Sequence, residues 1–122
     1  MSLTHYDAFT AWVKFGSAVR TINMGKLPGP CFVFKPIIGI PTAFNSGTDD
    51  TLTVGDGTDV DAFGTSYDLN VATDLAEFTG GVDIGYNLTG KDIVLTYTPS
   101  GSAATLGLAI VIVPFLRLPF PP

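Results

Sequence analysis

The sequence predicts an all-β protein, folded as a single antiparallel β-sandwich, on three observations. Apolar and polar residues alternate along several short segments, as they do in strands that bury one face. Turn-forming clusters such as SGTDD, GDGTD and PSGS separate these segments at intervals of about ten residues, the spacing typical of sandwiches and barrels. The 122 residues include 14 glycines and 9 prolines, a composition that favours one domain with many turns.

The first two expected strands, residues 8–15 and 18–24, lie in a region that has two interpretations. AWVKF alternates, AVRTI is rich in β-branched residues, and Gly16-Ser17 between them is an allowed two-residue hairpin turn. The alternative is a helix, because residues 4–7 match a capping box and the following glycine could end the helix. We favour the hairpin, since every later segment is typical of a strand.

Five further strands are expected in the middle of the chain. Residues 31–40 form a β-branched and aromatic run that Pro36 interrupts, which indicates a sheet edge or a bulge. Residues 51–54 form a short strand before a turn. Alternation in the next three strands predicts these inward side chains: Tyr67, Leu69 and Val71 in residues 66–72; Val82, Ile84, Tyr86 and Leu88 in residues 82–88; Ile93, Leu95 and Tyr97 in residues 92–98.

The last strand and the C-terminal residues differ from the rest. Residues 106–113 are apolar on both faces, which predicts a central strand or one covered by a neighbouring subunit. The strands then number about eight, as in a jelly roll.

Residues 114–122, PFLRLPFPP, contain too much proline to join the middle of a sheet and are too apolar for a disordered tail. We therefore divide the chain into a sandwich domain, residues 1–113, and an extended arm, residues 114–122. The arm lies on a neighbouring subunit or folds back on its own domain, and we favour the neighbour.

Composition and charge indicate a protein that contacts other protein. Hydrophobic residues make up 46% of the chain and charged residues 14%, against about 25% charged residues in typical domains. This shortage predicts a homo-oligomer. The net charge of −5 is uneven, with +3 in residues 1–35 and −8 in residues 36–122. No basic cluster suggests nucleic-acid binding, the longest apolar run is too short for a membrane span, and no signal peptide is recognisable.

No set of residues points to catalysis or to a cofactor. The single cysteine, Cys31, lies in an apolar run and is interpreted as a buried side chain, so no internal disulfide is expected. His5 is the single histidine, so any catalytic triad would have to be built on it, and a zinc site would lack ligands. Glu77 is the only glutamate, and no phosphate-binding loop is present. The chain is therefore not expected to be an enzyme.

The aspartate-rich stretch around GDGTD has two interpretations. Asp56, Asp59 and Asp61 are weak candidates for calcium ligands, because calcium takes several closely spaced oxygens. Stacked nonapeptide repeats would strengthen that interpretation, but the motif occurs once. We favour a turn in which the aspartates accept hydrogen bonds from nearby backbone amides while remaining solvated.

A stretch of turns and strands resembles small structural proteins of tailed-bacteriophage virions. The resemblance rests on TAFNSGTDDTLTVGDGTDVDAF at residues 42–63, on TGKDIVLTY at residues 89–97, on the final apolar strand and on LPGP at residues 27–30. It covers residues 25–116 and implies a small, jelly-roll-like β-sandwich used as a capsid decoration or cement protein. Such proteins commonly sit as trimers on the outside of the head and bridge neighbouring major capsid subunits. The group of proteins that the sequence resembles also includes tail-associated proteins.

The expected function follows from the composition and the resemblance together. We expect a virion protein, made in the host cytoplasm, on the outer surface of the capsid, with itself and the major capsid protein as partners. The alternative is a tail-fibre module that binds a host receptor or glycan, where Trp12 could stack on a sugar. The basic N-terminal third could face an acidic capsid. The candidate interface residues are Phe115, Leu116, Arg117, Leu118 and Phe120 in the arm, together with Trp12, Lys14, Arg20 and Lys26.

Overall fold

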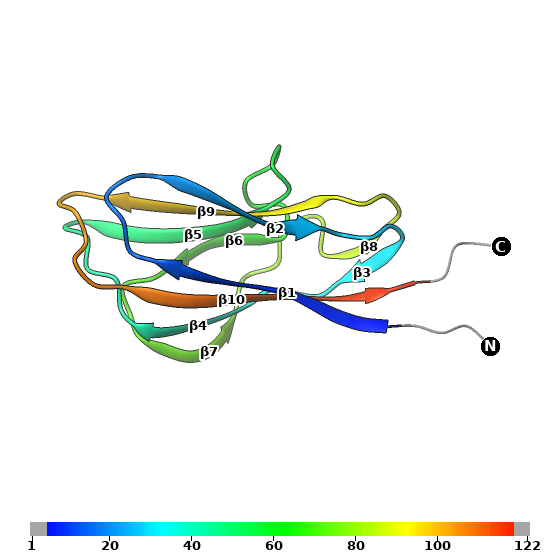
Figure 1. The fold of residues 1–122 in the computed structure, drawn as a ribbon, viewed down its shortest axis with the longest axis horizontal. Helices are drawn as coiled ribbons and strands as arrows, with labels where there is room; N and C mark the ends of the chain where they lie inside the picture. The colour runs from blue at the N-terminus through cyan, green and yellow to red at the C-terminus, as the bar shows by residue number, and fades with distance from the viewer. Residues whose placement is uncertain (1–4, 119–122) are drawn as a thin grey trace.

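The computed structural model describes residues 5–118, which form two antiparallel β-sheets packed against each other (Figure 1). This confirms the all-β sandwich, and the jelly-roll arrangement stays a prediction. One sheet contains β1 (His5–Lys14), β3 (Cys31–Val33), β4 (Ile37–Thr42), β7 (Thr73–Glu77), β8 (Gly85–Asn87) and β10 (Leu108–Arg117), in the order β7-β4-β10-β3-β8 with β1 on β10. The other contains β2 (Arg20–Lys26), β5 (Asp49–Gly55), β6 (Gly64–Asp68) and β9 (Asp92–Ser100), in the order β2-β9-β5-β6.

The described residues contain ten strands rather than about eight. The apolar run at residues 31–40 is divided into β3 and β4, and β7 was not expected. β7 escapes sequence analysis because TDLAE lacks the β-branched and aromatic residues that favour strands. No helix within residues 5–118 is long and apolar enough to cross a membrane.

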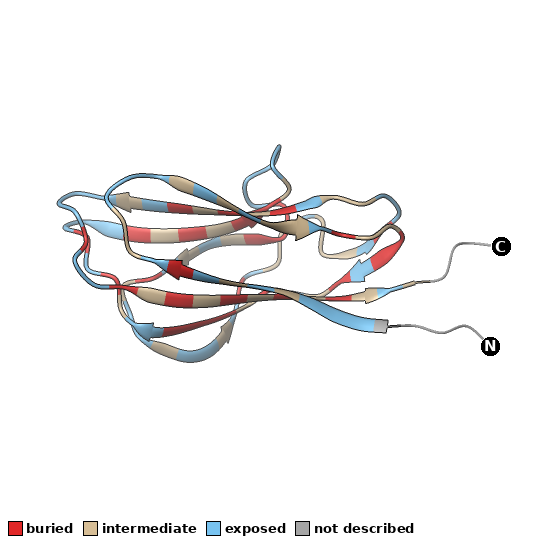
Figure 2. Ribbon diagram, viewed as in Figure 1, coloured by how far each residue is buried: buried red, intermediate tan, exposed pale blue. Residues whose placement is uncertain are grey.

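The core lies between the two sheets, and β10 contributes much of it. Ala109, Val111, Val113 and Phe115 are buried, while the alternate residues of β10 are half-buried on the outer face (Figure 2). β10 pairs with β1 on one side and with β3 and β4 on the other, which confirms that this apolar segment is a central strand. The opposite sheet contributes the buried side chains of Leu52, Val54, Ile93, Leu95 and Tyr97, so the inward residues expected for 92–98 are confirmed.

The expectation that residues 114–117 lie outside the sheet is wrong, because β10 continues through Pro114 to Arg117. The carbonyl oxygen of Pro114 accepts a hydrogen bond from the amide of Phe34 at 3.0 Å, and in an antiparallel strand the N–H of a residue points to the same side as its C=O. The donor that proline lacks would therefore face the break between β3 and β4, near Pro36. A central strand tolerates proline at such an irregularity. Residues 119–122 lie outside the described residues, so a shorter arm stays a prediction.

The N-terminal segments are strands, as favoured, but they do not form a hairpin. β1 pairs with β10 in one sheet, and β2 pairs with β9 in the other. The chain between them therefore crosses from one sheet to the other. The ring of Phe9 on β1 lies against Gly25 on β2, whose φ of +140° favours glycine. Contact through the core has replaced the hydrogen bonds expected between the two strands.

The predicted orientation of residues 82–88 is also wrong. Only Gly85–Asn87 forms a strand, and Asn87 is the buried residue in it. Its side-chain amide donates to the carbonyl oxygens of Asp83 at 3.0 Å and Gly85 at 3.2 Å. These bonds satisfy a polar group inside the protein, which the apolar–polar pattern cannot reveal. Three of the four residues expected to point inward, Val82, Tyr86 and Leu88, are exposed, and so is Val71, expected to point inward in residues 66–72.

Candidate assembly interface

The outer surface of the six-stranded sheet is apolar across most of its strands. Trp12 on β1 is 59% exposed, Leu75 on β7 is 67% exposed, and Tyr86 on β8 is 57% exposed. Strand register places these side chains on the same side as the half-buried outer residues of β10. We define the apolar face as Tyr6, Ala8, Trp12, Phe32, Phe34, Ile37, Leu75, Tyr86, Leu108, Ile110, Ile112, Pro114 and Leu116.

Aromatic rings gather at one end of the apolar face. The ring of Tyr6 stacks on Phe34 with centroids 5.9 Å apart, and Phe34 meets Phe32 at 5.1 Å. Phe32 lies opposite Tyr86 in the register of β3 and β8, and opposite Leu116 in the register of β3 and β10. Tyr6, on β1, lies opposite the same leucine. Aromatic residues of β1, β3 and β8, together with Phe34 just after β3, thus build one aromatic cluster around Leu116 of β10.

The apolar face has the size of an interaction site. Tyr6 is 76% exposed and Phe32 is 38% exposed, in addition to the tryptophan and Tyr86. Large aromatic side chains present about 150–250 Å² each, so these four leave on the order of 400 Å² in water before the aliphatic residues are added. Contiguous apolar patches beyond a few hundred Å² on soluble proteins generally mark interaction sites.

The outer surface of the four-stranded sheet is different in character. Thr21, Thr96 and Thr53 lie opposite one another across β2, β9 and β5. Thr51 faces Thr98 on one side and Asp68 on the other. This surface is polar and suited to water, so the two sheets give the molecule one apolar side and one hydrophilic side. The sequence indicated a shortage of charge, and the structure shows on which sheet that shortage is concentrated.

The expected interface residues of the C-terminal segment divide between core and surface. Phe115 is a correction: it is 3% exposed, and its ring stacks on Phe9 in the core with centroids 5.1 Å apart. Leu116 lies on the apolar face, Arg117 is exposed, and Leu118 is half-buried with its amide donating to the carbonyl oxygen of Pro30 at 3.1 Å. The remaining candidate, at position 120, lies outside the described residues.

The expected basic residues do not form one patch. Lys14 lies at the end of β1 on the side of the apolar face. Arg20 begins β2, where its guanidinium donates to the backbone carbonyl of Lys14 and lies over the ring of Tyr97 at 5.2 Å. Lys26 ends the same strand, about 20 Å away along extended backbone. Trp12 and Lys14 therefore belong to the six-stranded sheet, and Arg20 and Lys26 to the other.

The aspartates of the GDGTD stretch are engaged with the loop backbone. One carboxylate oxygen of Asp56 accepts from the amides of Thr58 at 2.9 Å and Asp59 at 2.7 Å. The hydrogen bond from the Asp59 amide is the main reason that the pKa of Asp56 lies below its ordinary value. A hydrogen bond with Asp59 and the negative charge of that residue raise the pKa of Asp61. Across residues 5–118, no three acidic, histidine or cysteine side chains are grouped as a metal site requires.

A buried carboxylate that sequence analysis missed lies between β5, β9 and the adjoining loops. Asp50 is fully buried. One of its oxygens accepts from the hydroxyls of Ser46 at 2.6 Å and Tyr97 at 2.7 Å, and the other from the Ser46 amide at 2.8 Å and the Asn70 side-chain amide at 3.0 Å. The sequence does contain a sign of this burial, because alternation with Leu52 and Val54 places Asp50 on the inward side of its strand.

The Asp50 cluster predicts a loss of stability in acid. Burial raises the pKa of Asp50, but the hydrogen bonds from Ser46, Tyr97 and Asn70 outweigh it, so the pKa lies below the ordinary value of 3.8. A carboxyl whose pKa is lowered by folding stabilises the protein above its unfolded-state pKa and loses that contribution as pH falls through the folded-state pKa. We expect the urea midpoint to hold between about pH 7 and pH 5 and to fall below about pH 4. An Asp50→Asn variant should lack this part of the acid dependence, and an equal fall in both proteins would contradict the assignment.

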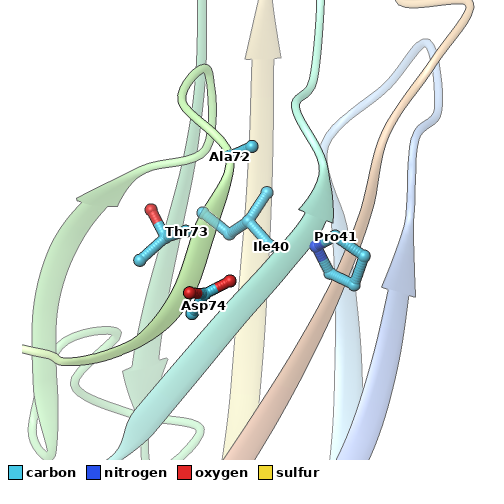
Figure 3. A pocket seen from close by; sticks show the side chains of 5 residues that line it. All are labelled: Ile40, Pro41, Ala72, Thr73 and Asp74. Carbon is cyan, nitrogen blue, oxygen red and sulfur yellow. The ribbon is translucent and has the colours of Figure 1, made fainter.

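A shallow pocket of about 380 Å³ lies between β4 and the beginning of β7, lined by Ile40, Pro41, Ala72, Thr73 and Asp74 (Figure 3). The pocket brings together the carboxylate of Asp74 and the hydroxyl of Thr73. That hydroxyl donates to the carbonyl oxygen of Val71, so the two side chains do not form a nucleophile hydrogen-bonded to its base. Cys31 is buried as predicted, and burial raises the pKa of its thiol, which opposes the reactive thiolate form.

Comparisons with known proteins identify the fold. By sequence the chain matches no protein-family model and no curated protein. By structure it is similar to a chain of the Cyanophage Pam1 capsid asymmetric unit, with a TM-score of 0.70 and 15% identity over 95% of this chain and 85% of that one. It is also similar to a chain of the acidic stable capsid structure of Helicobacter pylori bacteriophage KHP30, with a TM-score of 0.67, 16% identity and 94% coverage of both chains. A chain of the capsid of Ralstonia phage GP4 gives a TM-score of 0.64 and 16% identity over 97% and 86% of the two chains. At these identities the comparisons establish a shared fold over nearly the whole chain.

Proposed function

We propose that this chain is a structural protein of a tailed-phage virion, a capsid decoration or cement protein. It binds the outer surface of the head, bridges neighbouring major capsid subunits and assembles with copies of itself, as a trimer in the arrangement that the sequence resemblance implies. The single observation that carries this proposal is the apolar face, which marks the chain as a protein that buries one side against others. The fold that it shares with chains of three phage capsids supports the same assignment.

The proposed mechanism is adhesion by burial. A specific interface buries about 1,000 Å² or more in total, and the exposed and half-buried residues of the apolar face can supply a large part of one side. Rupture of the head would then have to break these contacts as well as those of the shell itself. Many copies on a symmetric shell add avidity, because each copy is held by more than one neighbour. Lys14 at the margin of the face favours an acidic partner surface.

The hydrophilic sheet gives the proposed arrangement a direction. With the apolar face against the shell, the threonine-rich surface of the four-stranded sheet would point to solvent. The acidic residues on or beside that sheet, including Asp49, Asp68 and Asp92, would then remain hydrated at no cost in desolvation. The opposite orientation would leave the aromatic cluster in water and bury a polar surface.

The experiment measures copy number and head strength together. Purified particles should contain the chain in hundreds of copies, and heads stripped of it should rupture at lower temperature than complete heads. Adding the purified chain back should restore the higher temperature, because the added contacts must break before the shell opens. A chain present only in tens of copies, and located on the tail, would overturn the decoration role and favour the tail-fibre alternative.

A further inference from the structure

The outer edge of β1 is a long strand edge without a partner. β1 pairs with β10 through all ten of its residues, from His5 to Lys14, without a bulge in the register. No other strand among the described residues pairs with it, so β1 forms one border of the six-stranded sheet (Figure 1). At about 3.3 Å per residue this edge is roughly 30 Å long.

The hydrogen-bonding groups on this edge can be assigned from the register. The amide of Phe15 donates to the carbonyl oxygen of Gly107 at 3.2 Å, which continues the register of β1 and β10. Bonding alternates along an antiparallel pair, so the N–H and C=O groups of Ala8, Thr10 and Trp12 point away from β10. The amide of Ala8 donates to its neighbour Asp7, but no hydrogen bond within the described chain reaches the backbone groups of Thr10 or Trp12 on this side.

The other borders of the sandwich carry features that discourage pairing. β2 has a register shift between Asn23 and Gly25 and carries basic residues at both of its ends. On the opposite side of the molecule, β6 is connected to the segment that follows β7 by the bridge between Gly64 and Gly80 and by the bond from the Thr65 amide to the Thr79 carbonyl oxygen. β8, at the end of the strand order, is only three residues long. Proteins that remain monomeric usually interrupt or charge their edge strands. β1 has no proline and no bulge, and its residues 8–13 are uncharged.

We propose that β1 pairs antiparallel with β1 of a second copy of this chain, about a two-fold axis at Thr10. The occupant is a second copy because the edge is complementary to itself. In this register Thr10 faces Thr10, the large side chain of Trp12 lies beside the small one of Ala8, and Lys14 lies beside the ring of Tyr6. A two-fold pairing also uses both edges at once and leaves no further β1 edge open, so each such contact joins two copies and no more. Two of the proposed trimers joined by such contacts would form a hexamer.

The pairing would join two sheets into one and place two apolar faces side by side. Trp12 and Tyr6 belong both to this edge and to the apolar face, so the two surfaces are continuous. The contact is independent of the proposed place on a phage head, because it is a property of the purified chain. It also differs from any three-fold contact, since three copies cannot share one two-fold pairing.

Proline and valine at position 10 give a matched test. Thr10→Pro removes the N–H that faces the second copy but breaks no bond to β10, whereas Thr10→Val keeps the N–H and the β-branched shape. Sedimentation should show an even-numbered wild-type assembly, a dimer or a hexamer, that Thr10→Val keeps and Thr10→Pro reduces to half its mass. A wild-type monomer or trimer, or an assembly unchanged by Thr10→Pro, would overturn the pairing. A trimer would do so while leaving the proposed decoration role intact.

A second measurement covers the case in which the proline variant does not fold. Thr10→Cys places two thiols opposite each other on the axis, and directly opposed residues have Cα atoms about 5.5 Å apart. A short thiol-to-thiol cross-linker should convert this variant to a covalent dimer. Thr21→Cys, on an exposed position of β2, is the control and should remain a single chain, as should the wild type with its buried Cys31. Equal cross-linking of both variants would show random encounter and would reject the pairing.

Discussion

Replacing Asp50 with alanine should remove a large fraction of this protein's free energy of unfolding. Asp50 is fully buried and accepts four hydrogen bonds, two of them from Ser46 and the others from Tyr97 and Asn70. Without the carboxylate, the amide and the hydroxyl of Ser46 lose their acceptor. Tyr97 keeps a long hydrogen bond to the carbonyl oxygen of Gly16 at 3.4 Å, and Asn70 keeps its bond to the carbonyl oxygen of Phe44 at 2.9 Å. Each buried group left unsatisfied costs about 1–3 kcal/mol. We expect a loss of about 3–5 kcal/mol in the free energy of unfolding, the cost of about two such groups, against a total of about 5–15 kcal/mol for a typical domain. Urea denaturation followed by tryptophan fluorescence would measure it.

The control for this prediction is another aspartate without the same surroundings. Asp74 is exposed and accepts no hydrogen bond from a side chain or backbone amide in the described chain, so Asp74→Asn should change the free energy of unfolding by less than about 0.5 kcal/mol. Tyr97→Phe should fall between the two, because it removes one donor and retains the ring packing against Phe44. If Asp50→Ala and Asp74→Asn had equal effects, the buried cluster would not be the stabilising element that its geometry indicates.

Strand positions were predictable from the sequence where one face of a strand is buried and the other faces solvent. Residues 92–98 show this best, since Ile93, Leu95 and Tyr97 are buried and the residues between them are not. The central position of β10 was predictable for the related reason that both of its faces are apolar. In both segments the side-chain pattern reports directly on burial, which is the property that decides the structure.

Pairing and irregularity could not be predicted in the same way. Whether β1 pairs with β2 or crosses to the other sheet depends on long-range contacts such as that of Phe9 with Gly25, which leave no local pattern. Pro114 is tolerated in a central strand only because the partner strand breaks beside it. Asn87 and Asp50 are polar residues in the interior. Asn87 bonds to the carbonyl oxygens of a nearby turn, and Asp50 accepts from Tyr97, which is 47 residues away in the sequence. A polar residue is ordinarily assigned to the surface, and only its phase with Leu52 and Val54 marks Asp50 as inward.

The existence of a protein-facing surface was predictable from the sequence, but only some of its residues were. The shortage of charge indicated a surface that faces protein, and Trp12 and Leu116 lie on the apolar face as members of that surface. The proline-rich ending drew attention to Phe115, which fills the core instead. Leu75 and Tyr86 were overlooked, because TDLAE does not resemble a strand and the phase of residues 82–88 was inverted. A correct sheet register was required to bring these residues together.

Charging the aromatic cluster should abolish attachment to phage heads. Phe32 and Tyr86 lie opposite each other on β3 and β8, and both side chains are exposed at the aromatic end of the apolar face. Phe32→Glu combined with Tyr86→Glu would force two carboxylates into an apolar interface, where unpaired charge is strongly unfavourable. We expect the affinity for stripped heads to fall by about 100-fold or more, the effect of losing one or two dominant interface residues. Sedimentation of heads with labelled chain would measure it.

The matched control adds the same charge to the hydrophilic sheet. Thr21 and Thr96 lie opposite each other on β2 and β9, so Thr21→Glu combined with Thr96→Glu reproduces the added charge and the like-charge pair. This variant should bind heads within about threefold of the wild type, because that surface points to solvent in the proposed arrangement. Urea denaturation of both variants separates lost contact from lost folding. Equal losses of affinity in two folded variants would show that net charge governs attachment, and a loss confined to the threonine variant would place the hydrophilic sheet against the head.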